Sequence, residues 1–347
     1  MTLTLSLFSL LSWTCGWILF RARNPIHPPL KEVKLDQLSI IIPARNEEKN
    51  LPALLISLQS DIQALEVLVV NDHSTDSTVE IAMSYGAKVI HSTPLPAQWS
   101  GKSWACWQGV QASSRQILLF LDSDTRFQKN GLKRFFSEFL ARENSALSVL
   151  PYHSVSQTYE QLSAFFNIFM CIGTVHSQRL TGQSLMVRRS DYFAVGGHSK
   201  VSKHVLENFF LTDPLNSAGI QTNTLLGDGI LQMRMFPEGI HQLIEGWTKA
   251  FIRGSHRVSL LNLALIVAWI SGFFSPLSLF SYSELASLIA YLGFAVQLGY
   301  FLRRLGSYSH FTALLYPLPL IFYVAICGVS ALRNQLGITS QWRGREV

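Results

Sequence analysis

Hydrophobic residues are concentrated at the two ends of this 347-residue chain. Residues 1–20 contain no charged side chain, and Arg21 and Arg23 follow directly. About 20 helical residues match a hydrocarbon core of about 30 Å. A cleaved signal peptide is the alternative, but it would have basic residues before the apolar run and small residues after it. We therefore expect an uncleaved transmembrane anchor over residues 1–20.

The C-terminal region, residues 258–332, contains three further apolar runs: 258–280, 285–302 and 311–332. Buried helices of a soluble protein would give the same pattern. Arg303, Arg304 and Arg333 at the ends of these runs favour membrane spans, followed by a basic tail over residues 333–347. Pro317 and Pro319 predict a kink in the last run, or a hairpin that does not cross.

The basic residues also predict sidedness. Four of them follow the first span closely: Arg21, Arg23, Lys31 and Lys34. The positive-inside rule then places the N-terminus outside and the central domain in the cytosol of a multi-pass protein of the cell membrane. Three complete C-terminal crossings would put Arg333, Arg343 and Arg345 outside, against the same rule. Either the last run does not cross, or another segment is miscounted.

Between the apolar ends, residues 36–254 alternate between short apolar runs and segments with helical spacing. The expected strands are Leu38–Ile42, Leu65–Val70, Lys88–His91 and Ile117–Leu121. The expected helices are Asn46–Leu58, with Asn46 as N-cap, Ser77–Tyr85 and Lys102–Ala112. This alternation predicts an α/β domain with a doubly wound, mainly parallel sheet. The apolar segment 159–172 is either an interfacial helix or a buried core helix.

Composition narrows the class of protein. Charged residues make up 14% of the chain, against about 25% in average globular proteins, and hydrophobic residues make up 48%. These values exclude a disordered chain and argue against a purely soluble enzyme. The net charge of +6 suits anionic lipids beside membrane segments, and we expect no nucleic-acid partner. The four cysteines are scattered, so neither a disulfide scaffold nor a zinc site is indicated.

Polar residues follow three of the expected strands, where ligands bind in doubly wound sheets. These segments are 43–48, 71–78 and 122–125. Neither GxGxxG after the first strand nor GxxxxGK[ST] occurs, so a dinucleotide dehydrogenase and a P-loop NTPase are unsupported. Asp122 and Asp124 can converge on Mg²⁺ or Mn²⁺ beside a diphosphate, although such pairs are often only loop caps. Asp72 can accept a hydrogen bond from a base or cap a helix, and Arg45 can stack on the base or pair with a phosphate.

Taken together, these segments resemble the family 2, GT-A-type inverting glycosyltransferases over residues 38–250. More narrowly, four segments resemble the membrane-bound diaponeurosporenoate (carotenoid) glycosyltransferases: 99–109, 196–198, 245–249 and 342–345. The resemblance implies transfer of a hexose, with UDP-glucose as the expected donor, to an apolar acceptor such as a carotenoid acid. The rivals are another lipid acceptor, such as a polyprenyl phosphate, a ceramide-like lipid or a hopanoid, and a non-catalytic membrane scaffold.

The resemblance also implies roles for single residues. Those expected at the nucleotide sugar are Pro43, Ala44, Arg45, Glu47, Asp72, Gly101, Lys102 and Asp122. Asp124, with Asp122, is expected to hold the metal, and His198 and Trp247 to contact the acceptor. A tryptophan at the membrane interface is the alternative for Trp247.

One position departs from the family pattern. Many relatives have Glu-Asp after the Gly-Gly element, with Asp as the general base, whereas this chain has Glu207-Asn208. Asn cannot take a proton at neutral pH. Glu207 is therefore the remaining candidate for the base, or no strong base is required because the acceptor is an ionised carboxylic acid.

Overall fold

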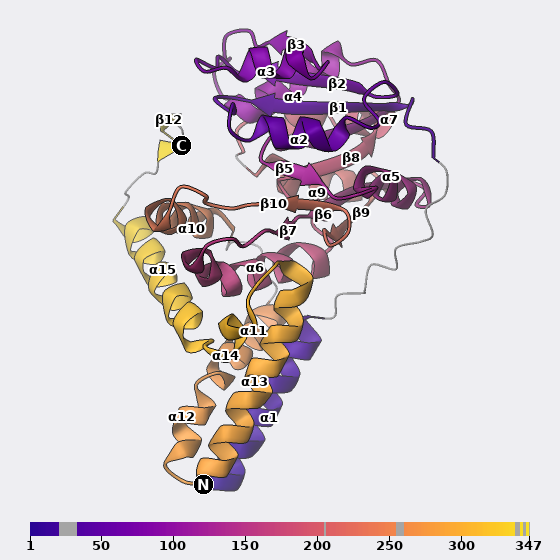
Figure 1. Cartoon of the computed structure of the whole chain (residues 1–347). Helices are drawn as coiled ribbons and strands as arrows, with labels where there is room; N and C mark the ends of the chain where they lie inside the picture. The colour runs from indigo at the N-terminus through magenta and orange to yellow at the C-terminus, as the bar shows by residue number, and fades with distance from the viewer. Residues whose placement is uncertain (21–32, 205, 255–259, 337–340, 343–344, 347) are drawn as a thin grey trace. The chain divides into compact units, whose positions relative to one another are not determined.

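The computed structural model describes residues 1–20, 33–204, 206–254, 260–336, 341–342 and 345–346 (Figure 1). The chain divides into two compact units. The α/β unit contains residues 23–152 and 177–233. The helical unit contains residues 1–22, 153–176 and 234–347. Residues 153–176 and 234–254, expected within the catalytic domain, therefore belong to the helical unit.

The α/β unit is built on a seven-stranded sheet of order β3-β2-β1-β4-β8-β6-β9. Its strands are β1 (Leu38–Ala44), β2 (Glu66–Asn71), β3 (Lys88–His91), β4 (Ile117–Leu121), β6 (Ser145–Leu150), β8 (Ser184–Arg188) and β9 (Gln221–Leu226). Only β8 runs antiparallel to its neighbours, and the other pairs are parallel. Every residue of β4 and β6 is buried, as expected for strands covered on both faces. The predicted doubly wound, mainly parallel sheet is confirmed.

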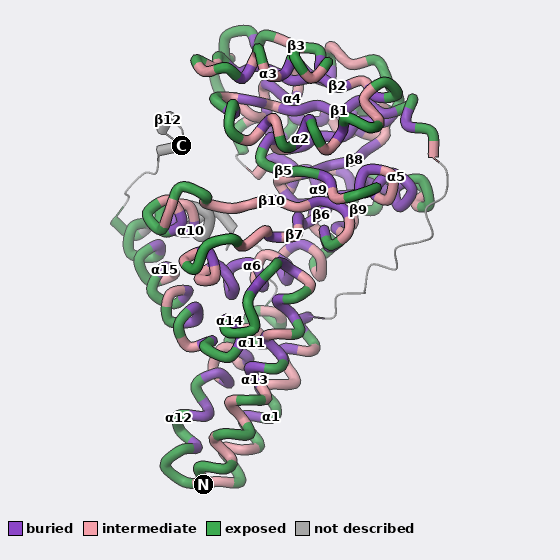
Figure 2. Tube along the Cα trace, viewed as in Figure 1, coloured by how far each residue is buried: buried purple, intermediate pink, exposed green. Residues whose placement is uncertain are grey.

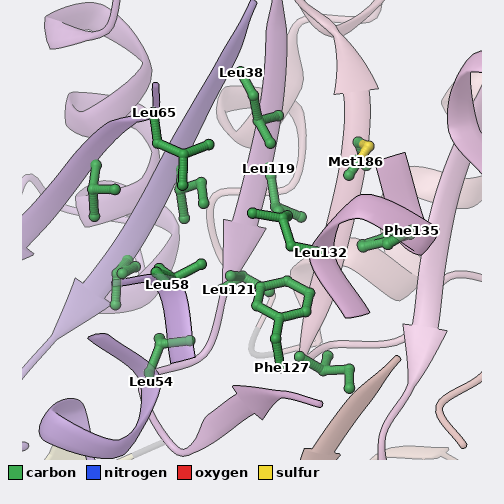
Figure 3. Close-up of a cluster of buried hydrophobic side chains, with 14 of the residues drawn as sticks. Leu38, Leu54, Leu58, Leu65, Leu119, Leu121, Phe127, Leu132, Phe135 and Met186 are labelled. Carbon is green, nitrogen blue, oxygen red and sulfur yellow. The ribbon is translucent and has the colours of Figure 1, made fainter. Parts of the chain in front are cut away.

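Helices cover both faces of this sheet. They are α2 (Leu51–Leu58), α3 (Thr78–Ser84), α4 (Gly101–Ala112), α5 (Gly131–Leu140), α7 (Arg189–Ala194), α8 (Gly197–Lys200) and α9 (Glu207–Ser217). Leu58, Leu119 and Phe135 belong to the core on one face (Figure 3). A second core, with Ile41 and Phe120, lies on the other face. The short strands β5 (Thr125–Phe127) and β10 (Leu231–Met233) pair antiparallel, and β7 (Tyr152–His153) follows β6.

Helix α2, the first helix of the α/β unit, begins later than its sequence pattern predicts. Asn46 is not an N-cap, because α2 starts only at Leu51. Asn46 has a positive φ of 54°, and its side-chain oxygen accepts a hydrogen bond from the Thr75 amide at 2.8 Å. The Glu47 amide donates to the Thr78 hydroxyl at 2.8 Å. These contacts between the loops after β1 and β2 hold residues 46–50 outside the helix.

The helical unit contains α1 (Thr2–Leu19), η1 (Thr158–Ser163), α6 (Ala164–Cys171), the π-helical turn η2 (Ile172–His176), α10 (Ile240–Gly254), α11 (Leu260–Gly272), α12 (Ser275–Phe280), α13 (Glu284–Leu305), α14 (His310–Leu314) and α15 (Pro317–Gln335). Helix α1 packs against α11, α12 and α13 (Figure 1). The strands β11 (Gln341–Trp342) and β12 (Arg345–Glu346) pair near the C-terminus. Of the predicted segments, residues 21–32, 205, 258–259, 337–340, 343–344 and 347 lie outside the described part of the chain.

Among the described helices, Thr2–Leu19 and Glu284–Leu305 are long and apolar enough to cross a membrane. Many of their apolar residues are exposed, and the exposed class is coloured green in Figure 2. Small residues permit close packing between the helices, since a Cβ atom on Gly16 would lie 2.3 Å from the Trp269 indole nitrogen. The segment 159–172 forms η1 and α6, and its Phe165, Phe166 and Ile168 are buried. That segment is therefore a core helix of the helical unit.

Candidate active site

The carboxyl ends of β1 and β2 bring Arg45 and Asp72 together. Ala44 and Asn71 are paired in the parallel register, and the Asp72 amide donates to the Ala44 carbonyl at 2.8 Å. Arg45 Nη1 lies 3.7 Å from Asp72 Oδ2. Two of the residues expected at the nucleotide sugar thus form a cation–carboxylate pair at one edge of the sheet, where a base and a phosphate can both find a partner.

The other residues expected near the nucleotide have structural contacts. Pro43 and Ala44 are the last residues of β1, and Ala44 belongs to the buried core. Glu47 is buried, and its carboxylate accepts a hydrogen bond from the Asn50 side chain at 2.8 Å. These contacts shape the loop after β1, and a direct contact with a nucleotide stays a prediction for these three residues.

Lys102 forms the centre of a charged cluster. It is the second residue of α4, directly after Gly101, and Ser100 is the N-cap of that helix. Its Nζ lies 2.6 Å from Asp122 Oδ1 and 2.8 Å from Glu207 Oε1. The same ammonium donates to the Gly182 carbonyl at 2.9 Å. The helix start, the end of β4 and the start of α9 therefore converge on one side chain.

Burial and charge act in opposite directions within this cluster. Glu207 is 1% exposed, so burial raises the pKa of its carboxyl, although the Lys102 charge lowers that pKa and the Asp122 charge raises it. For Lys102, burial lowers the pKa, but the two carboxylates outweigh burial and the net shift is upward. Lys102 is therefore a cation at neutral pH, placed between two carboxylates.

Asn208 lies beside this cluster. Its side-chain amide donates to the Gly182 carbonyl at 3.2 Å, so one carbonyl serves both Asn208 and Lys102. Within the described residues, Glu207 Oε2 and Asn208 Oδ1 are buried without a hydrogen-bond partner. Two buried acceptor atoms in this position suit a ligand that brings hydroxyl donors, as a sugar does.

Asp124 lies in the turn between β4 and β5 and is exposed. The turn is fixed by Thr125, whose amide and hydroxyl both donate to the Asp122 carbonyl, at 3.1 and 2.7 Å. Carboxylate oxygens are the ligands that Mg²⁺ and Mn²⁺ prefer. Lys102 engages Asp122 Oδ1, and Asp124 is the more exposed of the two carboxylates. No group of three or more His, Cys, Asp or Glu side chains suited to a metal occurs in the described residues, so diphosphate and water oxygens would complete the coordination.

His198, expected at the acceptor, is fully buried in the α/β unit. Its Nδ1 lies 2.9 Å from the Tyr192 hydroxyl, and its ring packs against Phe120 at 4.8 Å. Burial and the nearby Lys102 charge lower its pKa to about 3. The preceding Gly197 has a positive φ of 49°, and a Cβ atom there would lie 2.2 Å from the Tyr192 ring. The Gly-Gly-His segment is therefore close-packed, and this packing does not support an acceptor contact.

Trp247, also expected at the acceptor, belongs to α10 of the helical unit and is 4% exposed. It stacks on Phe166 with a centroid distance of 4.4 Å and an interplanar angle of 14°. Its indole N–H donates to the Ser163 hydroxyl at 2.9 Å. Stacking on an acceptor and anchoring at the membrane interface both require an exposed indole ring, and the Trp247 ring is buried.

The Gly182 carbonyl is the feature of the site that sequence reasoning missed. Its role depends on a backbone atom, and no residue type signals where a carbonyl will point. The only available signal is a glycine shortly before the expected Gly-Gly element, and a glycine alone predicts no acceptor site.

Comparison with known proteins relates this geometry to a family. The family pattern described as Glycosyl transferase family 2 matches residues 39–209. The 4,4'-diaponeurosporenoate glycosyltransferase of Staphylococcus aureus strain MRSA252 is 32% identical over 97% of this chain and 95% of its own length. The protein of the same name from strain USA300 matches to the same extent. Among solved structures, the mannosyltransferase PcManGT from Pyrobaculum calidifontis, in complex with GDP-Man and Mn²⁺, has a TM-score of 0.55. It is 14% identical, covers 97% of this chain and all of its own, and shares the fold.

Proposed function

The chain belongs to glycosyl transferase family 2 and is a glycosyltransferase, and we propose that it transfers a hexose from a nucleotide sugar to the carboxylate of an apolar, carotenoid-like acid. The relatives that are 32% identical over nearly the whole chain are named for such an acid, diaponeurosporenoate. We propose UDP-glucose as the donor. The product would be a glycosyl ester, formed with inversion at the anomeric carbon.

The observation that carries this proposal is the engagement of Glu207 by Lys102 at 2.8 Å, with Asn208 as its neighbour. A hydroxyl acceptor needs a base to take its proton. A carboxylic acid, with a reference pKa of about 4, is already ionised at neutral pH. Such an acceptor attacks the anomeric carbon with its own oxygen lone pair, the bond to the nucleoside diphosphate breaks, and no proton has to be removed. The substitution of Asn208 for an aspartate is then tolerated.

The donor end of the site is supported by Arg45, Asp72 and the two aspartates after β4. Asp72 would accept from the base and Arg45 would pair with a phosphate. We propose that Asp124, with Asp122, holds Mg²⁺ or Mn²⁺, which when bound neutralises charge on the leaving diphosphate. The mannosyltransferase of the same fold was solved with GDP-Man and Mn²⁺, in agreement with this assignment. Lys102 would hold Asp122 and Glu207 in place around the sugar.

We further propose that the enzyme acts at the cell membrane as a multi-pass protein with a cytosolic catalytic domain. The catalytic domain would lie within residues 36–254, between the anchor of residues 1–20 and the membrane region of residues 258–332. The support is the largely exposed apolar surface of α1 and α13, which is unfavourable in water. An apolar acceptor would reach the enzyme through the lipid phase.

A second candidate function is transfer to a lipid hydroxyl. The raised pKa of Glu207 favours it, because a base whose pKa is closer to neutral takes a proton more effectively. In that case Glu207 is the base and the product is a glycoside.

The chemistry of the product separates the two candidates. Membranes containing the enzyme are incubated with UDP-glucose and a carotenoid acid, its alcohol analogue, or extracted lipids, and the products are identified by mass spectrometry. We expect a hexosyl product of the acid that mild alkali cleaves. A product formed only from the alcohol, and stable to alkali, would replace the first candidate by the second.

A further inference from the structure

The chain does not continue away from α13 after Leu305 but folds back along it. The Arg303 guanidinium lies 3.1 Å from His310 Nδ1 at the C-terminal end of α13. Further along, a Cβ atom on Gly299 would lie 3.3 Å from the Ala313 Cβ. Next, the Tyr291 hydroxyl donates to the carbonyl of the residue after Ala313. Helix α14 has five residues, about 7.5 Å in length, and lies antiparallel beside α13. The long side chains of Arg303 and Tyr291 reach its two ends.

The chain then reverses direction. Tyr316 packs on Tyr291 with a centroid distance of 4.7 Å, and its hydroxyl donates to the Phe273 carbonyl at 3.2 Å. Helix α15 begins at the next residue and packs against α6, η1 and α10. Near its C-terminal end, the Ser330 hydroxyl donates to the Thr248 carbonyl of α10 at 3.0 Å. Figure 1 shows α14 beside α13 and α15 leading back to α10.

We propose that residues 307–335 form a re-entrant membrane hairpin that enters and leaves the bilayer on the same face. This inference rests on the membrane location proposed above. Helix α1, the pair α11–α12 and helix α13 then make three crossings. The outer surface of the hairpin contacts lipid acyl chains, and the C-terminus lies on the side of the membrane where α13 ends.

Lipid is the occupant that the outer surface of the hairpin fits. No charged residue occurs from Phe311 to Leu332. The outward side chains are apolar and well exposed: Phe311 70%, Leu318 60%, Ile321 61% and Leu332 57%. The neighbouring α13 exposes apolar side chains in the same way, Leu285 among them. Apolar surface of this extent is unfavourable in water and is covered favourably by acyl chains.

The turn of the hairpin satisfies the requirement that lipid places on the backbone. Irregular backbone at membrane depth is tolerated only where its polar groups find partners or are buried in protein. The Leu318 and Leu320 amides donate to the Leu315 and Tyr316 carbonyls, both at 3.0 Å. The amides of a first helical turn have no partner within the helix. Prolines at 317 and 319 carry no N–H, so two of these donors are absent at the deepest part of the hairpin.

The hairpin also removes the conflict over sidedness. Arg303 and Arg304 end α13, and Arg333 lies at the end of α15, which returns to the same side. The opposite end of α13 carries Glu284. With α15 returning, the basic residues at the helix ends lie on one side, as the positive-inside rule requires.

Cysteine labelling of the full-length protein in cells tests the inference. Cys15 and Cys327 are replaced by alanine, and single cysteines are introduced in separate variants: D36C in the α/β unit, S281C in the turn between α12 and α13, I321C on α15, and one appended after Val347. A membrane-impermeant maleimide is applied to intact and to permeabilised cells. We expect S281C to be labelled at least tenfold above the parent protein in intact cells. D36C and the appended cysteine should react only after permeabilisation, and I321C in neither case.

Three results would overturn the inference. Labelling of the appended cysteine in intact cells would show that α15 crosses the membrane. Labelling of S281C only after permeabilisation would remove the three crossings, and labelling of I321C after permeabilisation would show that the outer face of α15 contacts water. Hexose transfer is measured on the same membranes. If the appended cysteine is labelled in intact cells while hexose transfer is retained, only the hairpin is overturned. If the appended cysteine reacts only after permeabilisation while no hexose transfer is measured, only the proposed function is overturned.

Discussion

Two regions of this protein, the charged cluster at Lys102 and the bundle of α1, α11 and α13, bury polar side chains in different chemical forms. In the α/β unit, the buried Glu207 carboxylate faces the Lys102 ammonium, which also pairs with Asp122. In the helical unit, the fully buried Gln297 accepts a hydrogen bond from the Trp269 indole at 2.8 Å. Its amide donates to the Trp13 carbonyl, also at 2.8 Å. The site at Lys102 buries charges in pairs, whereas the contact between α1, α11 and α13 buries a neutral amide with complementary partners. The helical unit also buries one ion pair, Glu160 with Arg234 at 2.7 Å, but that pair lies at η1 and not between these apolar helices.

The physical reason is the cost of removing an ion from water. Removing one partner of a buried ion pair is strongly destabilising, because a charge without compensation remains. At a binding site this cost is acceptable, since the charges also serve charged ligands such as a diphosphate. Within a membrane bundle charges are rare, and neutral hydrogen bonds and small residues hold the helices together. The following predictions test whether the difference between the two regions reflects these two environments.

The largest effect should come from Asp124, the exposed carboxylate assigned to the metal. Asp124→Asn should reduce turnover by about 10³-fold, because a bound cation contributes several kcal/mol to charge stabilisation. Excess EDTA should abolish activity reversibly. The matched control is Asp36→Asn, an exposed aspartate of the same unit, which should change turnover less than about twofold. Unchanged turnover in EDTA would remove the metal assignment.

Lys102→Met should reduce turnover by about 10²-fold or more, since two carboxylates lose their common partner. It should also change the pH dependence. Lys102 lowers the pKa of Glu207, so its removal raises a pKa that burial has already raised. The group then ionises only at higher pH in the variant than in the parent, and the pH dependence of stability should report this change.

The pH dependence of the stability of the Lys102→Met variant should follow from the same rise in the Glu207 pKa. A carboxyl with a raised pKa in the folded state loses stability as pH rises above its unfolded value of about 4.5 toward its folded value. Lys102→Met should therefore lose more stability, relative to the parent, at pH 8 than at pH 5 in thermal unfolding. Lys102→Arg keeps the charge and should keep the profile. Parallel pH profiles for the Met variant and the parent would contradict the coupling.

Glu207→Gln should have a smaller effect, less than about tenfold on kcat, because the amide oxygen still accepts from Lys102 and an ionised acceptor needs no base. Glu207→Leu removes that contact and should cost more. The measurement is turnover with a carotenoid acid and UDP-glucose. A loss above about 10²-fold in the Gln variant, with an alkali-stable product, would instead make Glu207 the base.

The smallest effect should come from the helical unit. Gln297→Leu should lower stability by about 1 kcal/mol, since hydrogen bonds between membrane helices contribute about 0.6–2 kcal/mol. Gln297→Glu should destabilise more at pH 8 than at pH 5, because ionisation places a charge in the bundle. Thermal unfolding in detergent micelles measures both. Equal stability of the two variants at pH 8 would remove the contrast between the two regions.

Local pattern was sufficient for most elements of the α/β unit. Lys88–His91 and Ile117–Leu121 are strands with the predicted bounds. Short apolar runs ended by polar residues specify buried parallel strands because both faces of the sheet are covered. The strand ends at Arg45, Asp72 and Asp122 were predictable for the same reason. The start of α2 was not, because contacts with the loop after β2, from distant residues, outweigh local helical spacing.

Tertiary structure alone decided the pairing of charges and the path of the last apolar run. Lys102 and Glu207 are more than a hundred residues apart, and nothing local indicates that a helix start will meet another helix start across the end of β4. The sequence determined that residues 311–332 are apolar and contain two prolines. A crossing helix and a returning hairpin have the same composition, because lipid and a protein core both favour apolar side chains. Tertiary contacts, among them those of Tyr291 with Tyr316 and of Ser330 with Thr248, show that this run turns back.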